Sequence, residues 1–338
     1  MFLPLADSDS ENFVSLGDIG TTPWILLGVV VLVLLAIDLY RHRHAHEPTF
    51  REALFESLFW VACGLGFSLY VLVSFGNIAF GEYLSGYLIE KALSVDNVFV
   101  WSMLFTSMAI PLKYQHRVLF YGIFGALVMR AIFIFLGAEL LERFEILLLV
   151  FGFFLIYTGL GVIRHKEGEG ETSSRRGMSL LERFVPVSDE FDGQKFITVR
   201  NGNRVATPLL AALVVVEVTD IIFAVDSVPA ILAISQDRFL VFSSNAFAIL
   251  GLRAMYFLLA GAKERFHYLN HGLGAILVFV GGKMIAAWQG YHLNVWLSLA
   301  IITVLLVAAI LFSERKNRRL EQERSGSAVA PPSDAPSG

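Results

Sequence analysis

The sequence predicts an all-α membrane protein with about nine transmembrane helices, and composition is the first reason. Of the 338 residues, 56% are hydrophobic and only 17% are charged, whereas a soluble protein carries about 25% charged residues. The apolar runs are continuous and lack the alternation over about ten residues that the strands of a membrane barrel show. The net charge of −4 and the single cysteine, Cys63, argue against nucleic-acid binding, an internal disulfide and a thiolate metal cluster.

Nine segments are apolar and long enough to cross a bilayer as helices, which takes about 20 residues each. They run over residues 24–40, 54–75, 82–108, 115–137, 146–163, 207–235, 238–261, 269–288 and 293–312. The chain is thereby divided into an extracytoplasmic tail over 1–22, helices 1 and 2 over 23–81, a three-helix unit over 82–163, a loop over 164–206, a second three-helix unit over 207–288, helix 9 over 289–312 and a tail over 313–338.

The basic residues are distributed unequally between the two sets of connections. Of the 26 Lys and Arg residues, all but Arg143, Arg238 and four well inside spans lie in the connections after helices 1, 3, 5, 7 and 9 or in the first turn of the span that follows. Because short loops rich in Lys and Arg stay cytoplasmic, we expect a bacterial inner-membrane protein with its N-terminus outside and its C-terminus in the cytoplasm. Residues 1–22 contain no Lys or Arg, so we expect no cleavable signal peptide, which needs a basic start.

The cytoplasmic loop over 164–206 begins as a Gly- and Ser-rich linker. It ends with residues 196–199 and 204–206 on either side of Asn201-Gly202, a pair typical of a tight hairpin turn. We therefore expect a small β-hairpin in the loop. The tail beyond about residue 321 is polar and rich in Pro and Ser, and such segments do not pack, so we expect it to be disordered.

The two three-helix units carry matching residues in the same order. The matches, each given with its counterpart, are Glu90 and Asp220, Val95-Asp96 and Val225-Asp226, Arg130-Ala131 and Arg253-Ala254, and Leu149-Val150-Phe151 and Leu277-Val278-Phe279. Because each unit has an odd number of spans, the two copies must face opposite ways in the membrane. An inverted repeat of this kind is typical of secondary transporters, whose substrate site lies near the midplane of the bilayer.

Five carboxylates lie well inside helices 3 and 6, namely Glu90, Asp96, Glu217, Asp220 and Asp226. A carboxylate at the centre of a span costs about 2.5–3.5 kcal/mol on insertion, and a membrane helix needs none to fold. A bound cation or a proton pathway explains this cost. A structural alternative is that the acids only form salt bridges with the basic residues inside spans, which are Lys91, Arg130, Arg253 and Lys283.

The neighbours of these acids indicate the kind of ligand. Asp96-Asn97 and Asp226-Ser227 each place a carboxylate beside a neutral oxygen, without an adjoining His, Cys or Met. Such a site suits Mn²⁺, Mg²⁺ or Ca²⁺ better than Cu⁺ or Zn²⁺. Glu217 and Asp226 would point to opposite sides of a straight helix. Either helix 6 bends or these acids serve different steps. Pro229 could unwind the helix and free a backbone carbonyl as a ligand, and a simple packing kink at Pro229 is an equal alternative.

Proton movement follows from the same acids. Carboxylates in a low-dielectric environment favour the protonated form, so the binding of a metal ion would displace protons. We therefore expect a divalent cation to move one way and protons the other way.

Three long stretches of the sequence resemble a known family. They are GYLIEKALSVDNVFVW at 86–101, ATPLLAALVVVEVTDIIFAVDSVPAI at 206–231 and SNAFAILGLRAMYFLLAG at 244–261. The chain closely resembles the TerC family of integral membrane proteins, in particular its Alx-type members, from about residue 24 to 312. The resemblance implies a role in metal homeostasis, with manganese export as the activity attributed to Alx-type members. The family name refers to tellurium resistance, and a redox-modulator role has also been proposed for the family.

All five acids fall within the matching stretches, so the resemblance implies a role in the metal path at each of these positions. The predicted metal path comprises Glu90, Asp96, Asn97, Glu217, Asp220, Asp226 and Ser227, with Lys91, Arg130 and Arg253 as counter-ions or gating residues. Manganese is expected as a transported substrate, and no cofactor is expected.

Other interpretations are possible. Two aspartates could form an intramembrane protease dyad, but the sequence lacks the Gly-x-Gly-Asp and Pro-Ala-Leu elements of such enzymes, so we expect no enzyme. A second alternative is a membrane component of tellurium or oxyanion resistance, or a redox modulator, without metal transport. Two groups could assist metal movement or simply flank the spans: the cytoplasmic histidines 42, 44 and 46, and the outer glutamates 139, 142 and 145.

Overall fold

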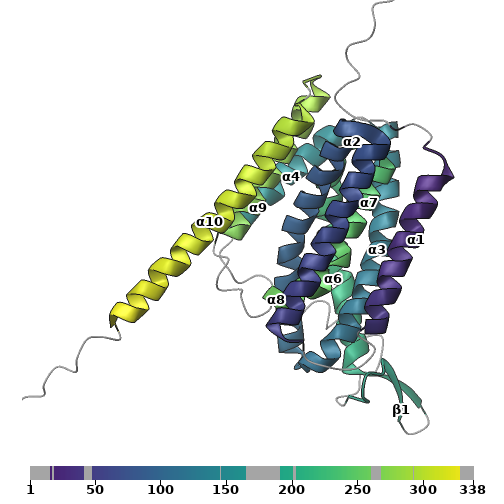
Figure 1. Ribbon diagram of the computed structural model, residues 1–338, viewed down its shortest axis with the longest axis vertical. Helices are drawn as coiled ribbons and strands as arrows, with labels where there is room; N and C mark the ends of the chain where they lie inside the picture. Colours follow the sequence, from purple (N-terminus) through teal and green to yellow (C-terminus); the bar gives the residue numbers. More distant parts are fainter. Residues whose placement is uncertain are drawn as a thin grey trace, which may run out of the picture.

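A computed structural model describes residues 16, 19–41, 48–144, 146–164, 191–200, 203–259, 268–291 and 293–327. Within these residues, seven helices are long and apolar enough to cross a membrane, and the bent pair α7–α8 would make eight if it forms one span. The expected all-α polytopic membrane protein is therefore confirmed. The elements, shown in Figure 1, are α1 (Thr21–Arg41), α2 (Phe50–Ser107), α3 (Leu112–Arg143), α4 (Ile146–Arg164), β1 (Ile197–Arg200), β2 (Asn203–Ala206), α6 (Pro208–Leu232), α7 (Arg238–Leu250), α8 (Leu252–Leu259), α9 (Leu269–Trp288) and α10 (Val295–Ser327).

Helix α2 reverses direction at Gly76. The backbone there has φ +88° and ψ −177°, a combination essentially restricted to glycine. The Tyr83 hydroxyl donates a hydrogen bond to the Gly64 carbonyl at 3.1 Å, whereas these positions would lie about 28 Å apart on a straight helix. The two halves of α2 therefore lie side by side, and they cover the expected spans 54–75 and 82–108. The total of nine spans stays a prediction.

The segment expected to form the seventh span is broken. Helices α7 and α8 meet at Gly251 with a bend of 40°. A Cβ atom at Gly251 would lie 2.8 Å from both Lys91 Nζ and Trp60 Cβ, so only a residue without a side chain fits between them. The sequence has no proline here, and a single glycine inside an apolar run gives no clear signal of a break.

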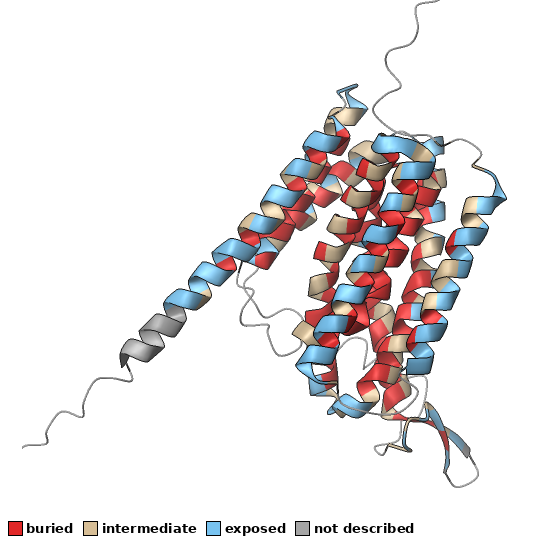
Figure 2. Cartoon of the chain, in the orientation of Figure 1, coloured by how far each residue is buried: buried red, intermediate tan, exposed pale blue. Residues whose placement is uncertain are grey.

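The helices form a bundle whose buried faces turn toward one another. Figure 2 shows the buried positions on the inner faces of the helices and the exposed ones on the outside. The outer positions carry large apolar side chains, including Ile25 at 63% and Val73 at 86% exposure. An apolar outer surface of this kind is what contact with lipid requires. At one edge of the bundle, α10 packs against α9 and α2.

The two three-helix units pack against each other through two helix pairs, each with one helix from either unit. Helices α3 and α6 run in parallel, with Gly122 against Val216. The second half of α2 runs parallel to α7 in the same way, with Gly86 against Ser244. A two-fold axis between the units would produce this pair of contacts. The inverted repeat itself stays a prediction.

Helices α4 and α9 approach each other unusually closely. A Cβ atom added at Gly152 would lie 2.9 Å from the carbonyl oxygen of Gly281, and one added at Gly159 would lie 2.7 Å from that of Gly274. The two backbones are therefore in direct contact at two levels. Small residues allow such close packing between membrane helices.

Outside the bundle, β1 pairs with β2 as an antiparallel hairpin with Ile197 opposite Ala206. These strands lie in the loop segment where the sequence predicts a hairpin. Helix α10 continues past residue 312, where the last span was expected to end, and remains helical to Ser327. An ion pair between Glu314 and Arg318, at 3.1 Å, supports this extension, since charges four residues apart stabilise a helix.

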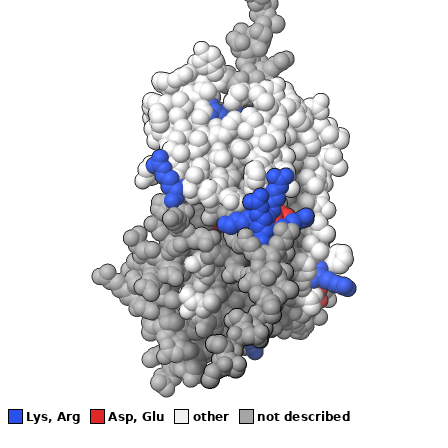
Figure 3. All heavy atoms as spheres, turned by 90° about the vertical axis from the view of Figure 1, so that its left-hand side faces the viewer, with Lys and Arg blue, Asp and Glu red and all other residues white. Residues whose placement is uncertain are grey.

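Basic side chains are unevenly distributed on one face of the molecule. The hairpin and the C-terminal end of α10 lie at the lower end in Figure 1. In the face shown in Figure 3, Lys and Arg gather in the middle and lower part, below a surface that is mostly uncharged. The cytoplasmic placement of the α10 end stays a prediction. The acidic N-terminal tail, His42, His44 and His46, Glu145 and the end of the C-terminal tail lie outside the described residues.

Candidate functional site

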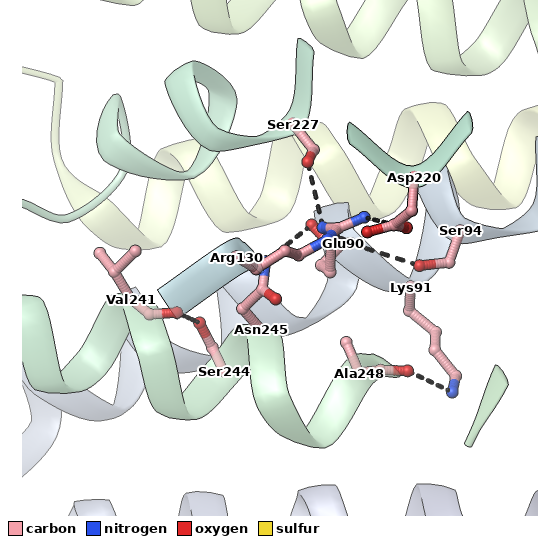
Figure 4. Close-up of polar contacts among 10 residues, drawn as sticks. All are labelled: Glu90, Lys91, Ser94, Arg130, Asp220, Ser227, Val241, Ser244, Asn245 and Ala248. Carbon is pink, nitrogen blue, oxygen red and sulfur yellow. Dashed lines mark hydrogen bonds and ion pairs between the residues drawn. The ribbon is translucent and has the colours of Figure 1, made fainter. Parts of the chain in front are cut away.

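Arg130 of α3 lies at the centre of a buried polar group between α2 and α6. Its Nη1 atom forms an ion pair with Glu90 Oε1 and donates a hydrogen bond to the Ser227 hydroxyl at 3.0 Å. Its Nη2 atom lies 3.5 Å from Asp220 Oδ1. Figure 4 shows these side chains converging on the guanidinium from two helices. Three of the predicted site residues are thus brought together around one predicted counter-ion.

Burial strengthens the electrostatic interactions between Arg130 and the two acids. Glu90 is 0% exposed, and Arg130 and Asp220 are each 1% exposed. Charges in a low-dielectric interior interact more strongly than charges in water. The two carboxylates carry two negative charges against one positive charge on Arg130, so the centre is negative by one charge when both acids are ionised.

Two further side chains hold Glu90 in place. Asn245 of α7 donates a hydrogen bond from Nδ2 to Glu90 Oε2 at 3.1 Å, and the Ser94 hydroxyl donates to Glu90 Oε1 at 3.4 Å. Sequence reasoning missed both residues. Ser94 could have been found, because it lies one helical turn after Glu90. Asn245 could not, because its position depends on how α7 packs against α2.

Asp220 differs from Glu90 in its surroundings. Neither of its carboxylate oxygens accepts a hydrogen bond from the described residues. A buried carboxylate without hydrogen bonds is costly. Its interaction with Arg130 is therefore its main compensation in this arrangement.

Lys91 does not join the group around Arg130. Its Nζ atom donates to the backbone carbonyl of Ala248 in α7 at 3.1 Å, and Figure 4 shows it turned away from Arg130. The amine also contacts Gly251, where α7 ends. Lys91 thus connects the helix that carries Glu90 to the break between α7 and α8.

Three of the predicted acids have no partner among the described residues. Asp96, Glu217 and Asp226 are partly buried, and none of them forms an ion pair or a side-chain hydrogen bond within the described part of the chain. The Glu217 carboxylate packs against the backbone of α3 at Gly125. All three lie on the same two helix segments as Glu90 and Asp220.

The predicted metal residues do not form one metal-binding cluster. Within the described ranges, no group of three or more His, Cys, Asp or Glu side chains is placed to hold a metal ion. The unwound turn expected near Pro229 is also not found, because α6 is helical from Pro208 to Leu232. Asn97 is buried in α2, where its role as a ligand stays a prediction.

Arg253 lies apart from the acids that it was expected to neutralise. It forms an ion pair with Asp38 of α1 and lies 3.9 Å from Glu56 of α2, which also pairs with Arg41 at 3.2 Å. The expectation that Arg253 would be a counter-ion of helices 3 and 6 is therefore corrected. The signal for its partners was present, because Asp38 and Glu56 are acids inside the predicted spans 24–40 and 54–75.

Two further basic residues, Lys283 and Arg238, also lie close to acids. Lys283 interacts electrostatically with Glu82. At the N-terminal end of α7, Arg238 forms ion pairs with Glu139 at 2.9 Å and with Glu142 at 2.7 Å. The described outer glutamates therefore link α3 to α7 in this structure.

The comparisons with known proteins decide the family. The profile of the integral membrane protein TerC family matches residues 75–321. This chain belongs to the TerC family. The TerC match includes Arg130 and all five acids of helices 3 and 6, whereas Asp38 and Glu56 lie before it.

Individual relatives agree with the TerC assignment. An uncharacterized membrane protein of Myxococcus xanthus is 48% identical over 309 residues, which cover 91% of this chain and 96% of the relative. A protein of Escherichia coli (strain K12), named Alx and described as a membrane-bound redox modulator, is 43% identical over 313 residues. The matched residues cover 90% of this chain and 97% of the relative. No solved structure matches.

Proposed function

We propose that this TerC protein is a secondary transporter that exports a divalent metal cation, with Mn²⁺ as the favoured substrate. One observation carries the proposal: Asp96, Glu217 and Asp226 lie in α2 and α6 without a partner among the described residues. Carboxylates inside spans usually pair or mark a path for ions and protons. The paired acids, Glu90 and Asp220, account for only part of the charge on these helices.

The ligand chemistry supports a hard divalent ion. The side chains near Arg130 offer carboxylate, hydroxyl and amide oxygens, from Glu90, Asp220, Ser227 and Asn245. Oxygen ligands suit Mn²⁺, Mg²⁺ and Ca²⁺. The acids are spread along two helices and do not form one cluster, which suits an ion that moves stepwise through a path.

Proton antiport is the second part of the proposal. In the absence of metal, the unpaired acids would lower their electrostatic cost by taking up protons. Metal entering from the cytoplasm would then displace these protons. The proposal places the protein in the bacterial inner membrane with its C-terminus in the cytoplasm, and it assigns no enzymatic reaction to the chain.

The alternative function in oxyanion resistance or redox modulation has less support from the site. An oxyanion needs a free positive charge, but the guanidinium of Arg130 is already opposed by two carboxylates. A redox role would rest on Cys63, the only cysteine in the chain. One thiol cannot form a disulfide within the chain.

Transport is tested with purified protein in vesicles that contain a metal-sensitive dye and a pH-sensitive dye. We expect Mn²⁺ flux that a proton gradient accelerates and that moves protons in the opposite direction. The double variant Asp96→Asn, Asp226→Asn should lose most of this flux, whereas Cys63→Ser should retain it. Mn²⁺ flux that neither drives nor responds to proton movement would refute antiport, and absence of any divalent flux would refute the transport function.

A further inference from the structure

We propose that Arg130 acts as a tethered substitute for the transported cation, so that its guanidinium occupies the oxygen-lined centre whenever no metal ion is bound there. This inference rests on the transport function proposed above. It adds a role for a positive side chain inside a site whose expected ligands are all oxygens. The transported ion must then displace Arg130 before it can bind Glu90 and Asp220 together.

The geometry around the guanidinium is the first argument. Oxygen atoms of Glu90, Asp220 and Ser227 face it from α2 and α6, and Figure 4 shows them converging on the tip of the Arg130 side chain. Two carboxylates and a hydroxyl are also a suitable partial ligand set for a hard divalent cation. The Arg130 side chain therefore occupies a position that a metal ion could take.

The charge balance is the second argument. Arg130 supplies one positive charge to two fully buried carboxylates. Asp220 accepts no hydrogen bond from the described residues, so the centre is undercompensated on that side. A divalent ion would neutralise both carboxylates, which a single guanidinium does not.

The attachment of Arg130 is the third argument. Its Nη atoms make all of its polar contacts within the described residues, and its Nε atom makes none. The side chain is thus held at its tip, where the competing ion would bind. An ion that reached the centre would therefore meet the same oxygen atoms that hold the guanidinium.

The repeat offers a matched control. Arg253 has the position in α8 that matches Arg130 in α3, and it is also buried and ion-paired. Its partners, Asp38 and Glu56, lie on α1 and α2, away from the proposed path. Removal of either arginine takes an ion-pair partner away from buried carboxylates, but only the loss of Arg130 should be repaired by metal.

The test uses the full-length protein purified in detergent. Unfolding temperatures are measured with and without saturating Mn²⁺, and Mn²⁺ affinity is measured by titration calorimetry. Arg130→Gln should lower the unfolding temperature without metal, and Mn²⁺ should restore it with a larger shift than in the wild type. The Mn²⁺ dissociation constant should fall by about tenfold or more, because two buried negative charges then lack a competitor.

The controls separate a competing role from a structural one. Arg253→Gln should also unfold at a lower temperature, but with the Mn²⁺-induced shift of the wild type. Glu90→Gln should weaken Mn²⁺ binding in both the wild-type and the Arg130→Gln background. If Arg130→Gln does not fold, Arg130→Lys is measured in its place. A lysine places its charge at one point and opposes the two acids less well, so its Mn²⁺ binding should be tighter than that of the wild type.

Three results would overturn the inference. The first is an Arg130 variant that binds Mn²⁺ no more tightly than the wild type. The second is a loss of stability in Arg130→Gln that Mn²⁺ does not restore. The third is a Mn²⁺-induced shift of the unfolding temperature that is as large in Arg253→Gln as in Arg130→Gln. Failure of the transport function itself is distinguished by the wild-type vesicles. If they carry no divalent ion, the function fails, whereas normal wild-type flux with unchanged affinity in Arg130→Gln refutes only the role of Arg130.

Discussion

Arg253 of α8 forms a buried ion pair with Asp38 of α1, and this contact ties the first helix to the broken helix pair. We predict that Asp38→Asn lowers the free energy of unfolding by roughly 3–5 kcal/mol, because it removes the carboxylate charge that lies against the buried guanidinium of Arg253. The measurement is denaturant unfolding in detergent. The double variant Asp38→Asn, Arg253→Gln should be less destabilised than the sum of the single variants. Additive effects would show that the two residues are not coupled.

The reversal of α2 at Gly76 leads to a second prediction. Alanine at this position would have to adopt a backbone conformation that is essentially restricted to glycine, so Gly76→Ala should cost about 1–3 kcal/mol in stability. Gly66→Ala is the control, since Gly66 lies in the same helix and an added Cβ atom there meets nothing within 4 Å. Thermal unfolding in detergent compares the two. Equal stability of both variants would show that the turn tolerates a side chain.

The contact between α4 and α9 leads to a third prediction. An added Cβ atom at Gly152 would lie 2.9 Å from the backbone oxygen of Gly281 and 2.7 Å from Ile285 Cγ1. Gly152→Ala should therefore push the helices apart and cost about 1–3 kcal/mol. Gly282→Ala is the matched variant, because Gly282 is next to the contact but has open space around it. A Gly152→Ala protein as stable as Gly282→Ala would contradict this packing.

Growth of cells tests the unpaired acids. In a host without its own manganese exporter, expression of the protein should restore growth in excess Mn²⁺ and lower the internal manganese content. Asp96→Asn and Asp226→Asn should each reduce this tolerance severely, because each removes an oxygen ligand and a charge from the path. Glu314→Gln, which changes an exposed acid of α10, should leave it unchanged. Normal tolerance and normal internal metal in both aspartate variants would refute the transport function.

Much of the fold could be predicted from local patterns. The apolar runs indicate the helices, because in lipid every backbone group must be satisfied within its own segment. The break at Gly251 could not be predicted, since its cause lies in Lys91 and Trp60 of another helix. For the region around Gly76, the sequence predicts only a short connection between two spans. The sequence does not show that the helix continues up to this residue on both sides.

The sequence indicates which residues form the site, but it does not indicate which acid pairs with which arginine. Glu90, Asp220 and Arg130 were recognisable because charge is costly inside a span, and the structure places them together. Arg253 occupies the matching position in the predicted repeat but pairs with Asp38. The acids inside the first two predicted spans are visible in the sequence, but which arginine they meet depends on how α1 and the first half of α2 pack, and these lie outside the predicted repeat.

The double contact between α4 and α9 has a mechanical consequence. Two helices whose backbones touch at Gly152–Gly281 and again at Gly159–Gly274 cannot slide along each other without first separating. Helices α4 and α9 would therefore move as a rigid body, and α10, which lies against α9, would move with them. Any opening of the bundle toward either side of the membrane would then move α4, α9 and α10 together as one unit.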